Sequence, residues 1–370
     1  MSEWSASVGG GLRRKVGVAA LSTGVLAALA SASTAQTITE FPLPAGNSGV
    51  RFVTSGPDGN IWFTRAGPAF ENRVGKMTTS GNVTEFAIPT SDADPRGITT
   101  GSDGNVWFTE YGASTIARVT RTGTISEFPV SENVHPDGIA AGPDGNLWFT
   151  DPPVGRIGRI SVDGSDVVLH QLPPGSFPLD IATGPDGNLW FTDVDTRSVG
   201  RITPAGVVTE FALPGGGVPY GIATGPDGNL WFTEQVTVRI GRITPSGVIT
   251  EFEIPAFEPG FVSFPKGISA GSDGNLWWAD FFAFRNSRIG RITPSGAMTF
   301  FPLPNTQSSS DITAGPDGNV WFTVEGANLI GRVEIAGAGA AVPTLSTGVL
   351  LLLGIGLGTV GVYVVRSRAL

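Results

Sequence analysis

One phrase returns seven times in this chain: glycine, proline or serine, aspartate, glycine, asparagine, an aliphatic residue and tryptophan. Successive copies begin 45, 41, 42, 41, 46 and 44 residues apart. A period in the low forties indicates repeated sheet units, because each unit can bury its apolar face only against a neighbour. The copies begin at Gly56, Gly101, Gly142, Gly184, Gly225, Gly271 and Gly315.

Each unit predicts four short strands. In the third copy, residues 138–141 lead into the turn at 142–146, and residues 147–150 follow it. Proline and aspartate favour the first turn positions, and glycine tolerates positive φ, so these segments form a hairpin of strands a and b. Runs of the type Ile-Gly-Arg-Ile and Val-Thr-Glu-Phe supply strands c and d. The sequence therefore predicts an all-β, seven-bladed β-propeller of four-stranded antiparallel blades.

The two ends of the repeat region predict how the ring closes. Residues 38–44 (ITEFPLP) form a d strand with no preceding partners, and the last unit stops after its c strand at residues 330–333. We expect these fragments to complete one blade, which removes the exposed sheet edges of an open array. The tryptophan that recurs in every unit is expected to pack between blades.

Composition supports this class and limits the partners. The chain has 53 glycines, 28 prolines and only 15% charged residues, as in a turn-rich all-β protein. A formal net charge of -9 argues against nucleic acid, because phosphate binding calls for a basic face. The absence of cysteine excludes disulfides and thiolate metal sites. We expect a monomer.

The termini predict export. Basic residues 13–15 precede an apolar run at 16–30, so residues 1–35 are interpreted as a signal peptide, with the Sec and twin-arginine routes both open. The propeller spans 37–335, and a linker with a sorting motif follows at 336–344. Residues 345–370 predict a transmembrane helix with a basic cytoplasmic tail.

The C-terminal segment begins Val-Pro-Thr-Leu-Ser at residue 342 and ends in an arginine cluster. It resembles the IPTLS-CTERM sorting signals of Gram-negative bacteria. The resemblance implies processing by an exosortase-type enzyme and delivery to the cell surface. A plain single-span membrane anchor is the alternative interpretation.

Two sets of side chains are predicted at one mouth of the central channel, because the start of strand a and the end of strand b are hairpin partners. The residues that begin strand a are Arg51, Arg96, Asp137, Leu179, Tyr220, Lys266 and Ser310. The residues that end strand b are Arg65, Glu110, Asp151, Asp193, Glu234, Asp280 and Val324.

Acidic residues dominate the second set. We expect Asp137 and Asp151 to face each other in one blade, and His135 to approach the same mouth. Such a negative sector suits a hard cation, Mg²⁺ or Ca²⁺, held by Asp151, Asp193, Glu234 and Glu110, with Asp137 or His135 as a catalytic base. A solvated acidic rim without a metal is the alternative.

Aromatic residues suggest a second kind of surface at this mouth. Tyr220 begins a strand a, and a group of phenylalanines occupies the longest loop and the end of a neighbouring strand b. An aromatic wall beside a polar mouth suits a small molecule, a glycan or a peptide, although the rings could simply pack on each other. The phenylalanines concerned are Phe257, Phe261, Phe264, Phe281 and Phe282.

The combined motif of Pro-x-Gly-Ile, Gly-Pro-Asp-Gly-Asn-Leu-Trp-Phe-Thr-Glu and Ile-Gly-Arg-Ile-Thr-Pro-Ser-Gly resembles the virginiamycin B lyase family over residues 37–335. The resemblance implies a seven-bladed propeller that opens a cyclic depsipeptide by elimination, with magnesium and a catalytic histidine. In the family that histidine occupies the x of Pro-x-Gly-Ile. None of the seven x positions here is histidine: Asp137 stands at x in the third copy, and His135, two residues before it, lies where the family places a glutamate.

Three functional hypotheses follow. The first is a surface-displayed module that binds a ligand at the channel mouth. The second is a divalent-metal lyase of altered specificity that uses Asp137 or His135 as base. The third is a hydrolase similar to the calcium-dependent lactonase propellers.

Overall fold

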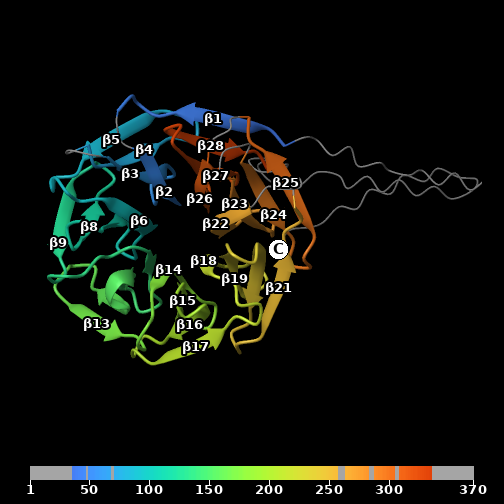
Figure 1. The fold of residues 1–370 in the computed structure, drawn as a ribbon. Helices are drawn as coiled ribbons and strands as arrows, with labels where there is room; N and C mark the ends of the chain where they lie inside the picture. The colour runs from blue at the N-terminus through green and yellow to red at the C-terminus, as the bar shows by residue number, and fades with distance from the viewer. Residues whose placement is uncertain are drawn as a thin grey trace, which may run out of the picture. The chain divides into compact units, whose positions relative to one another are not determined.

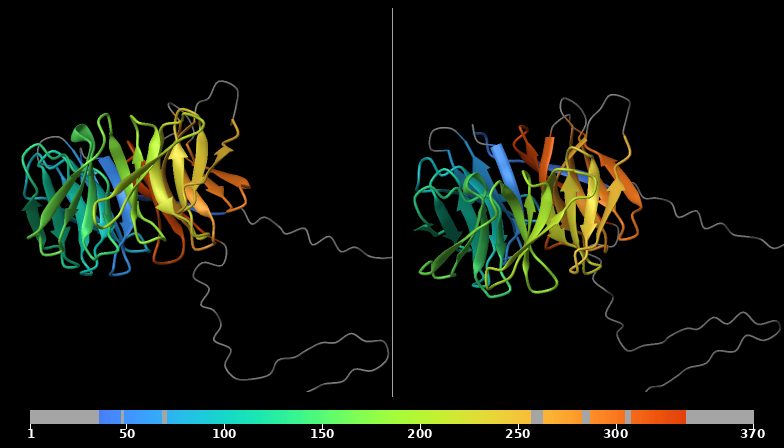
Figure 2. Two further views of the ribbon diagram at one scale, coloured as in Figure 1. Left: turned by 90° about the horizontal axis from the view of Figure 1, so that it is seen from below. Right: turned by 60° about the horizontal axis from the view of Figure 1, so that its bottom comes forward.

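The computed structural model describes residues 36–46, 49–67, 71–256, 263–282, 287–304 and 308–335, apart from the side chain of Phe282. These residues form seven four-stranded antiparallel sheets arranged as blades around a central channel (Figure 1). The first strand of each blade lies nearest the axis, and the fourth lies on the rim. Figure 2 shows the blades from the side, with their strands running between the two faces of the ring. The predicted seven-bladed propeller is confirmed.

Consecutive groups of four strands from β2 to β25 form blades 1 to 6, and β26, β27, β28 and β1 form blade 7. The first fourteen strands are β1 (Ile38–Pro42), β2 (Gly49–Ser55), β3 (Ile61–Ala66), β4 (Arg73–Met77), β5 (Val83–Ala87), β6 (Pro95–Thr100), β7 (Val106–Glu110), β8 (Thr115–Val119), β9 (Ile125–Pro129), β10 (Ile139–Ala141), β11 (Leu147–Asp151), β12 (Arg156–Ile160), β13 (Val167–Gln171) and β14 (Pro178–Thr183). The other strands are β15 (Leu189–Asp193), β16 (Ser198–Ile202), β17 (Val208–Ala212), β18 (Pro219–Thr224), β19 (Leu230–Glu234), β20 (Arg239–Ile243), β21 (Ile249–Glu253), β22 (Ser263–Ala270), β23 (Leu276–Phe282), β24 (Arg288–Ile292), β25 (Met298–Pro302), β26 (Ser308–Ala314), β27 (Val320–Glu325) and β28 (Leu329–Val333). One short 3₁₀ helix, Pro152–Val154, follows β11.

The repeated phrase builds the turn between the first two strands of a blade. In blade 3, the Gly142 N–H donates to the Asn146 carbonyl at 2.7 Å, and Gly145 adopts a φ of 83° that favours glycine. The Asp144 carboxylate accepts hydrogen bonds from the Asn146 backbone and from Trp148 Nε1. The aspartate therefore closes the turn and fixes the orientation of the tryptophan ring.

The recurring tryptophans pack between blades, as predicted. Trp62 of blade 1 lies in one core cluster with Ile98 and Phe108 of blade 2, and its side chain is fully buried. Each tryptophan also contacts an aromatic ring of strand d, and in blade 3 the ring of His170 takes that place, 5.6 Å from Trp148. Burial of such a side chain contributes about 2–3 kcal/mol to stability.

The ring closes through the predicted pairing of the two ends of the repeat region. The strand β1 pairs antiparallel with β28, with Ile38 opposite Val333 and Pro42 opposite Leu329. Phe41 stacks on Trp321 at a centroid distance of 5.3 Å. Blade 7 is therefore completed by the N-terminal strand.

The segments predicted for export and anchoring lie outside the described residues, at 1–35 and 336–370. Among the residues that the structure describes, no helix is long and apolar enough to cross a membrane.

Candidate functional site

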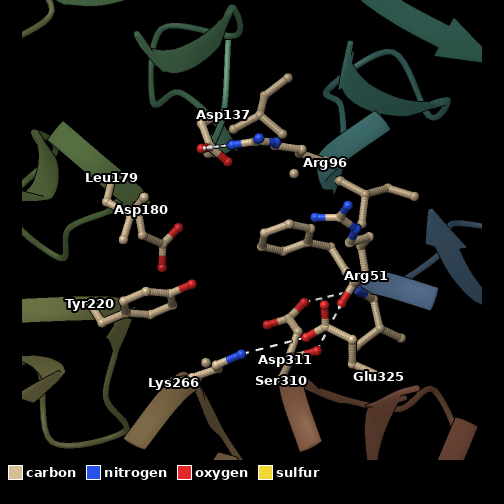
Figure 3. Close-up of a pocket in the computed structure, with 18 residues that line it drawn as sticks. Arg51, Arg96, Asp137, Leu179, Asp180, Tyr220, Lys266, Ser310, Asp311 and Glu325 are labelled. Atoms are coloured by element: carbon tan, nitrogen blue, oxygen red, sulfur yellow. Dashed lines mark hydrogen bonds and ion pairs between the residues drawn. The ribbon is translucent and has the colours of Figure 1, made fainter. Parts of the chain in front are cut away.

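The central channel contains a cavity of about 330 Å³. All seven residues that begin strand a line it, one from each blade (Figure 3). These residues are Arg51, Arg96, Asp137, Leu179, Tyr220, Lys266 and Ser310. Their side chains differ from blade to blade, whereas the turn and the tryptophan recur, so the channel is where the blades are chemically distinct.

A β-bulge directs these side chains into the channel. In blade 4, Pro178 pairs with Asp193 and Ile181 pairs with Phe191, so three steps along β14 match two steps along β15. The extra residue leaves Leu179 and Asp180 out of the regular ladder. The same register shift occurs at the corresponding positions of blades 1, 2, 5, 6 and 7.

The expectation that the acidic residues at the end of strand b face the channel is wrong. Where the register is defined, each pairs with the proline before the first residue of strand a, as Glu234 does with Pro219, and the side chains are fully buried away from the cavity lining. A shift of one residue moves a side chain to the opposite face of a strand. The residues affected are Glu110, Asp151, Asp193, Glu234 and Asp280.

Each of these buried acids has its own local environment. Asp151 pairs with Arg156 at 2.6 Å and accepts a hydrogen bond from the His135 backbone N–H. Asp193 accepts a hydrogen bond from the Phe177 N–H at 2.9 Å. Asp137 and Asp151 therefore do not face each other, and the predicted negative sector is not formed.

Asp137 lies in the channel, but it is engaged by a cation. Its carboxylate is 2.7 Å from Arg96 Nη1, and the side chain is buried. Arg96 also pairs with Asp94 at 3.1 Å and lies over the Tyr111 ring. Burial raises the pKa of Asp137, and the charge of Arg96 opposes that shift.

His135 lies away from the cavity. Its Nδ1 is 3.1 Å from the Tyr111 carbonyl oxygen, and the two rings are in contact. The histidine is not among the residues that line the cavity. The structure therefore separates the two residues predicted as catalytic bases.

Among the predicted aromatic ligand-binding residues, Tyr220 lines the cavity. Phe264 and Phe281 pack edge to face at 6.0 Å, and Lys266 Nζ lies 4.7 Å from the Phe281 centroid. Neither ring lines the cavity. Phe257 and Phe261 lie outside the described residues, as does the side chain of Phe282.

Sequence reasoning missed three acidic residues of the channel: Asp180, Asp311 and Glu325. Asp180 and Asp311 come directly after the first residue of strand a, a position at which four other copies have glycine. Glycine is required where a neighbouring blade approaches closely: a Cβ on Gly97 would lie 2.5 Å from the Asp137 carbonyl oxygen. The replacement of glycine by aspartate is the sequence signal for Asp180 and Asp311. It lies one position after the strand-a residues that were predicted to line the channel.

Both missed aspartates are held by backbone groups. Asp180 Oδ2 accepts a hydrogen bond from the Ile222 N–H of the next blade at 2.9 Å. Asp311 Oδ2 accepts one from the Val53 N–H at 2.8 Å. Burial nevertheless raises the pKa of Asp180 to about 6 and that of Asp311 to about 7. Burial also raises the pKa of Tyr220 to about 12.

The family model for virginiamycin B lyases matches residues 15–259 and 256–363, which together span most of the chain. The chain belongs to the virginiamycin B lyase family. The family assignment agrees with the resemblance found in the repeat motifs.

Solved structures related to the virginiamycin B lyase family show the same architecture. A streptogramin B lyase is 36% identical, with a TM-score of 0.74 and coverage of 81% of this chain and 97% of that chain. A catalytically inactive His-to-Ala variant of virginiamycin B lyase from Staphylococcus aureus, solved with quinupristin, is 35% identical, with a TM-score of 0.74 and coverage of 81% and 99%. The extracellular domain of a hybrid two-component system from B. thetaiotaomicron shares the fold alone, at 14% identity, a TM-score of 0.61 and coverage of 80% and 42%. A comparison with curated protein sequences found no match.

The donor set of the channel does not fit the magnesium ion that the virginiamycin B lyase family implies. Within the described residues, no three acidic or histidine side chains are grouped as metal ligands. Asp137 pairs with Arg96, and Glu325 pairs with Lys266 at 3.5 Å. The other two channel carboxylates already accept backbone hydrogen bonds.

Proposed function

We propose that this member of the virginiamycin B lyase family binds a small ligand at the mouth of its central channel and leaves it chemically intact. The observation that supports this proposal is that the seven variable residues at the start of strand a converge on one cavity. A concave site with both apolar and charged lining is the usual form of a small-molecule pocket. The ligand is a small molecule, or one end of a glycan or peptide.

The absence of the family's histidine from the first positions of strand a favours binding over elimination. None of these seven residues is histidine, and the candidate base among them, Asp137, forms a 2.7 Å ion pair with Arg96. A carboxylate that is already paired with a guanidinium is a weak proton acceptor. If it took up a proton, the buried guanidinium would lose its counter-charge.

A variant whose cavity is filled by a larger side chain tests the binding proposal. Leu179 lines the cavity, so Leu179→Trp is expected to fill it without removing a polar contact. Ligand-observed NMR with a fragment library is expected to show binders to the wild type that Leu179→Trp no longer binds. The matched control is Val207→Trp, which places the same ring on an exposed turn and is expected to keep the binders. If the wild type binds no fragment, or if Leu179→Trp binds the same fragments equally well, the proposal fails.

A second candidate is a lyase of altered specificity. It is favoured by the 36% identity to a streptogramin B lyase over 97% of that chain. In this candidate Asp137 is the base, and burial raises the pKa of its carboxyl, which makes the carboxylate a stronger proton acceptor. The two functions differ in the fate of a bound cyclic depsipeptide.

We further propose that the protein is exported as a monomer and displayed at the cell surface of a Gram-negative bacterium. The signal-like residues 1–35 and the sorting-like segment from residue 342 support this location. An exosortase-type enzyme would act on that segment, and a membrane-anchored form is the alternative. Mass spectrometry of the protein recovered from the cell surface would show whether both segments have been removed.

A further inference from the structure

Two carboxylates in the channel form no ion pair with any residue that the structure describes. The three basic residues of the cavity ring are paired elsewhere: Arg96 with Asp137, Lys266 with Glu325, and Arg51 with Asp94. For Asp180 and Asp311, the described residues provide only backbone hydrogen bonds. The channel therefore contains two fixed acidic groups that no described side chain neutralises.

These carboxylates are rigidly placed and accessible from the cavity. Asp180 accepts hydrogen bonds from the Ile181 and Ile222 N–H groups at 2.8 and 2.9 Å, so its oxygens are tied to two adjacent blades. Asp311 is tied in the same way to Val53 of blade 1. Both line the cavity, and they project into it from blades 4 and 7 (Figure 3). A carboxylate oxygen that accepts one hydrogen bond retains a lone pair for a second donor.

A tyrosine and a phenylalanine complete this part of the channel. The Tyr220 hydroxyl points into the cavity between the two aspartates and has no hydrogen-bond partner among the described residues (Figure 3). Its pKa, which burial raises to about 12, keeps the phenol neutral, so its oxygen can accept a hydrogen bond. The Phe52 ring lines the same cavity. Aromatic faces attract organic cations through their quadrupole.

We propose that the channel binds the protonated amino group of a small organic amine between Asp180, Asp311 and the Tyr220 hydroxyl. This inference rests on the proposed ligand-binding function and names the chemical class of the ligand. An ammonium group has three donors and no acceptor, which matches two carboxylates and one phenol oxygen. The cavity of about 330 Å³ lies at the small end of ligand pockets, which limits the amine to a small molecule or the end of a longer one.

An organic ammonium fits this site better than a divalent metal. Hard cations take six or more oxygen ligands, whereas the two aspartates already accept backbone N–H donors and a neutral phenol is a poor ligand. The described residues also provide no group of three acidic or histidine ligands. The aromatic rings add attraction for an organic cation that a hydrated metal would not gain.

Three probes of one shape test the charge preference: benzylammonium, benzyl alcohol and benzoate. In titration calorimetry of the purified protein at pH 8, benzylammonium is expected to bind at least tenfold more tightly than benzyl alcohol, and benzoate more weakly than either. If benzoate or benzyl alcohol binds as tightly as benzylammonium, the proposal is overturned. If fragments bind the channel but benzylammonium does not, ligand binding stands and the amine proposal fails.

The affinity for benzylammonium is also expected to depend on pH. Because Asp180 and Asp311 must be ionised, affinity should rise as pH increases through their pKa values of about 6 and 7 and level off near pH 8. A tenfold or greater loss between pH 8 and pH 5 is expected, and an unchanged affinity contradicts the proposal. The charged and titratable groups that face this site are Arg51, Arg96, Asp137, Tyr220, Lys266 and Glu325.

Variants separate this site from a general loss of structure. Asp311→Asn is expected to weaken benzylammonium binding tenfold or more, and Asp163→Asn, in the exposed turn after β12, is expected to leave it unchanged. Because Asp311→Asn also alters a backbone contact, Leu179→Lys provides a second test: its tethered ammonium is expected to occupy the site and block the probe in a folded protein. Unchanged benzylammonium affinity in a folded Leu179→Lys variant overturns the proposal.

Displacement of the probe by millimolar Mg²⁺ or Ca²⁺, but not by Na⁺ at equal ionic strength, would identify a metal as the occupant and also overturn the proposal.

Discussion

Glu110 in blade 2 lacks the arginine that neutralises the same position in blades 3 and 6. Asp151 and Asp280 pair with Arg156 and Arg288, each at 2.6 Å, from the start of the next strand. In blade 2 that place is taken by Thr115, and no donor in the described structure reaches either Glu110 oxygen. Burial, together with the neighbouring carboxyl of Glu127, raises the pKa of Glu110 to about 8. The Glu110 carboxyl of the folded protein therefore retains its proton at neutral pH.

This buried proton makes stability depend on pH. Between the unfolded pKa near 4.5 and the folded pKa of about 8, the native state binds the proton and the unfolded state does not, so the free energy of unfolding falls as pH rises. The expected loss from this group is about 1.4 kcal/mol per pH unit in that interval. Glu110→Gln should remove this slope, so that the variant gains stability relative to the wild type from pH 5 to pH 8. Urea unfolding at both pH values measures the difference.

The exposed Glu132→Gln variant is the control and should show no such trend. A stability difference between Glu110→Gln and the wild type that is the same at pH 5 and pH 8 would contradict this account of Glu110.

The strands could be predicted from the sequence because their signals are local. The turn of blade 3 is closed by Asp144 and glycines within a few residues of each other, and the same chemistry recurs in every copy. The faces of strand a could not be predicted in the same way. A bulge of one residue at the start of β14 sets Asp193 opposite Pro178 rather than Leu179, so the residue that begins strand a and the residue that ends strand b are not cross-strand partners. The sequence therefore predicted the cavity-lining residues of strand a correctly and the orientation of their hairpin partners incorrectly.

Ring closure depends on the single strand β1. Deletion of residues 36–46 is expected to leave β28 with an unpaired edge and to expose Trp321, which Phe41 covers at 5.3 Å. Loss of the Phe41 ring alone, in Phe41→Ala, should cost about 2–3 kcal/mol of unfolding free energy, and the deletion should cost more. Chemical denaturation of the three proteins measures both values. An equal unfolding free energy for the deletion variant and the wild type would show that β1 does not close the ring.

At the scale of the whole molecule, the repeated and the variable residues have separate roles. Recurrent residues such as Trp62 and Asp144 form the packing between blades and the turns. The channel is built from the positions where the copies differ, and its polar residues include Asp180 and Asp311, which replace a recurrent glycine. Family membership follows from the recurrent residues, whereas the lining of the channel follows from the variable ones. The 36% identity with a streptogramin B lyase is therefore compatible with a different set of residues in the channel.

The most direct test of this account is the fate of quinupristin, the compound in the related structure from Staphylococcus aureus. The purified protein would be incubated with quinupristin, with and without Mg²⁺, and the products examined by mass spectrometry. Because none of the residues that begin strand a is the family's histidine, and Asp137 is bound to Arg96, the account predicts an intact macrocycle under both conditions. Accumulation of the linear elimination product, lost in Asp137→Asn, would contradict it and establish the lyase.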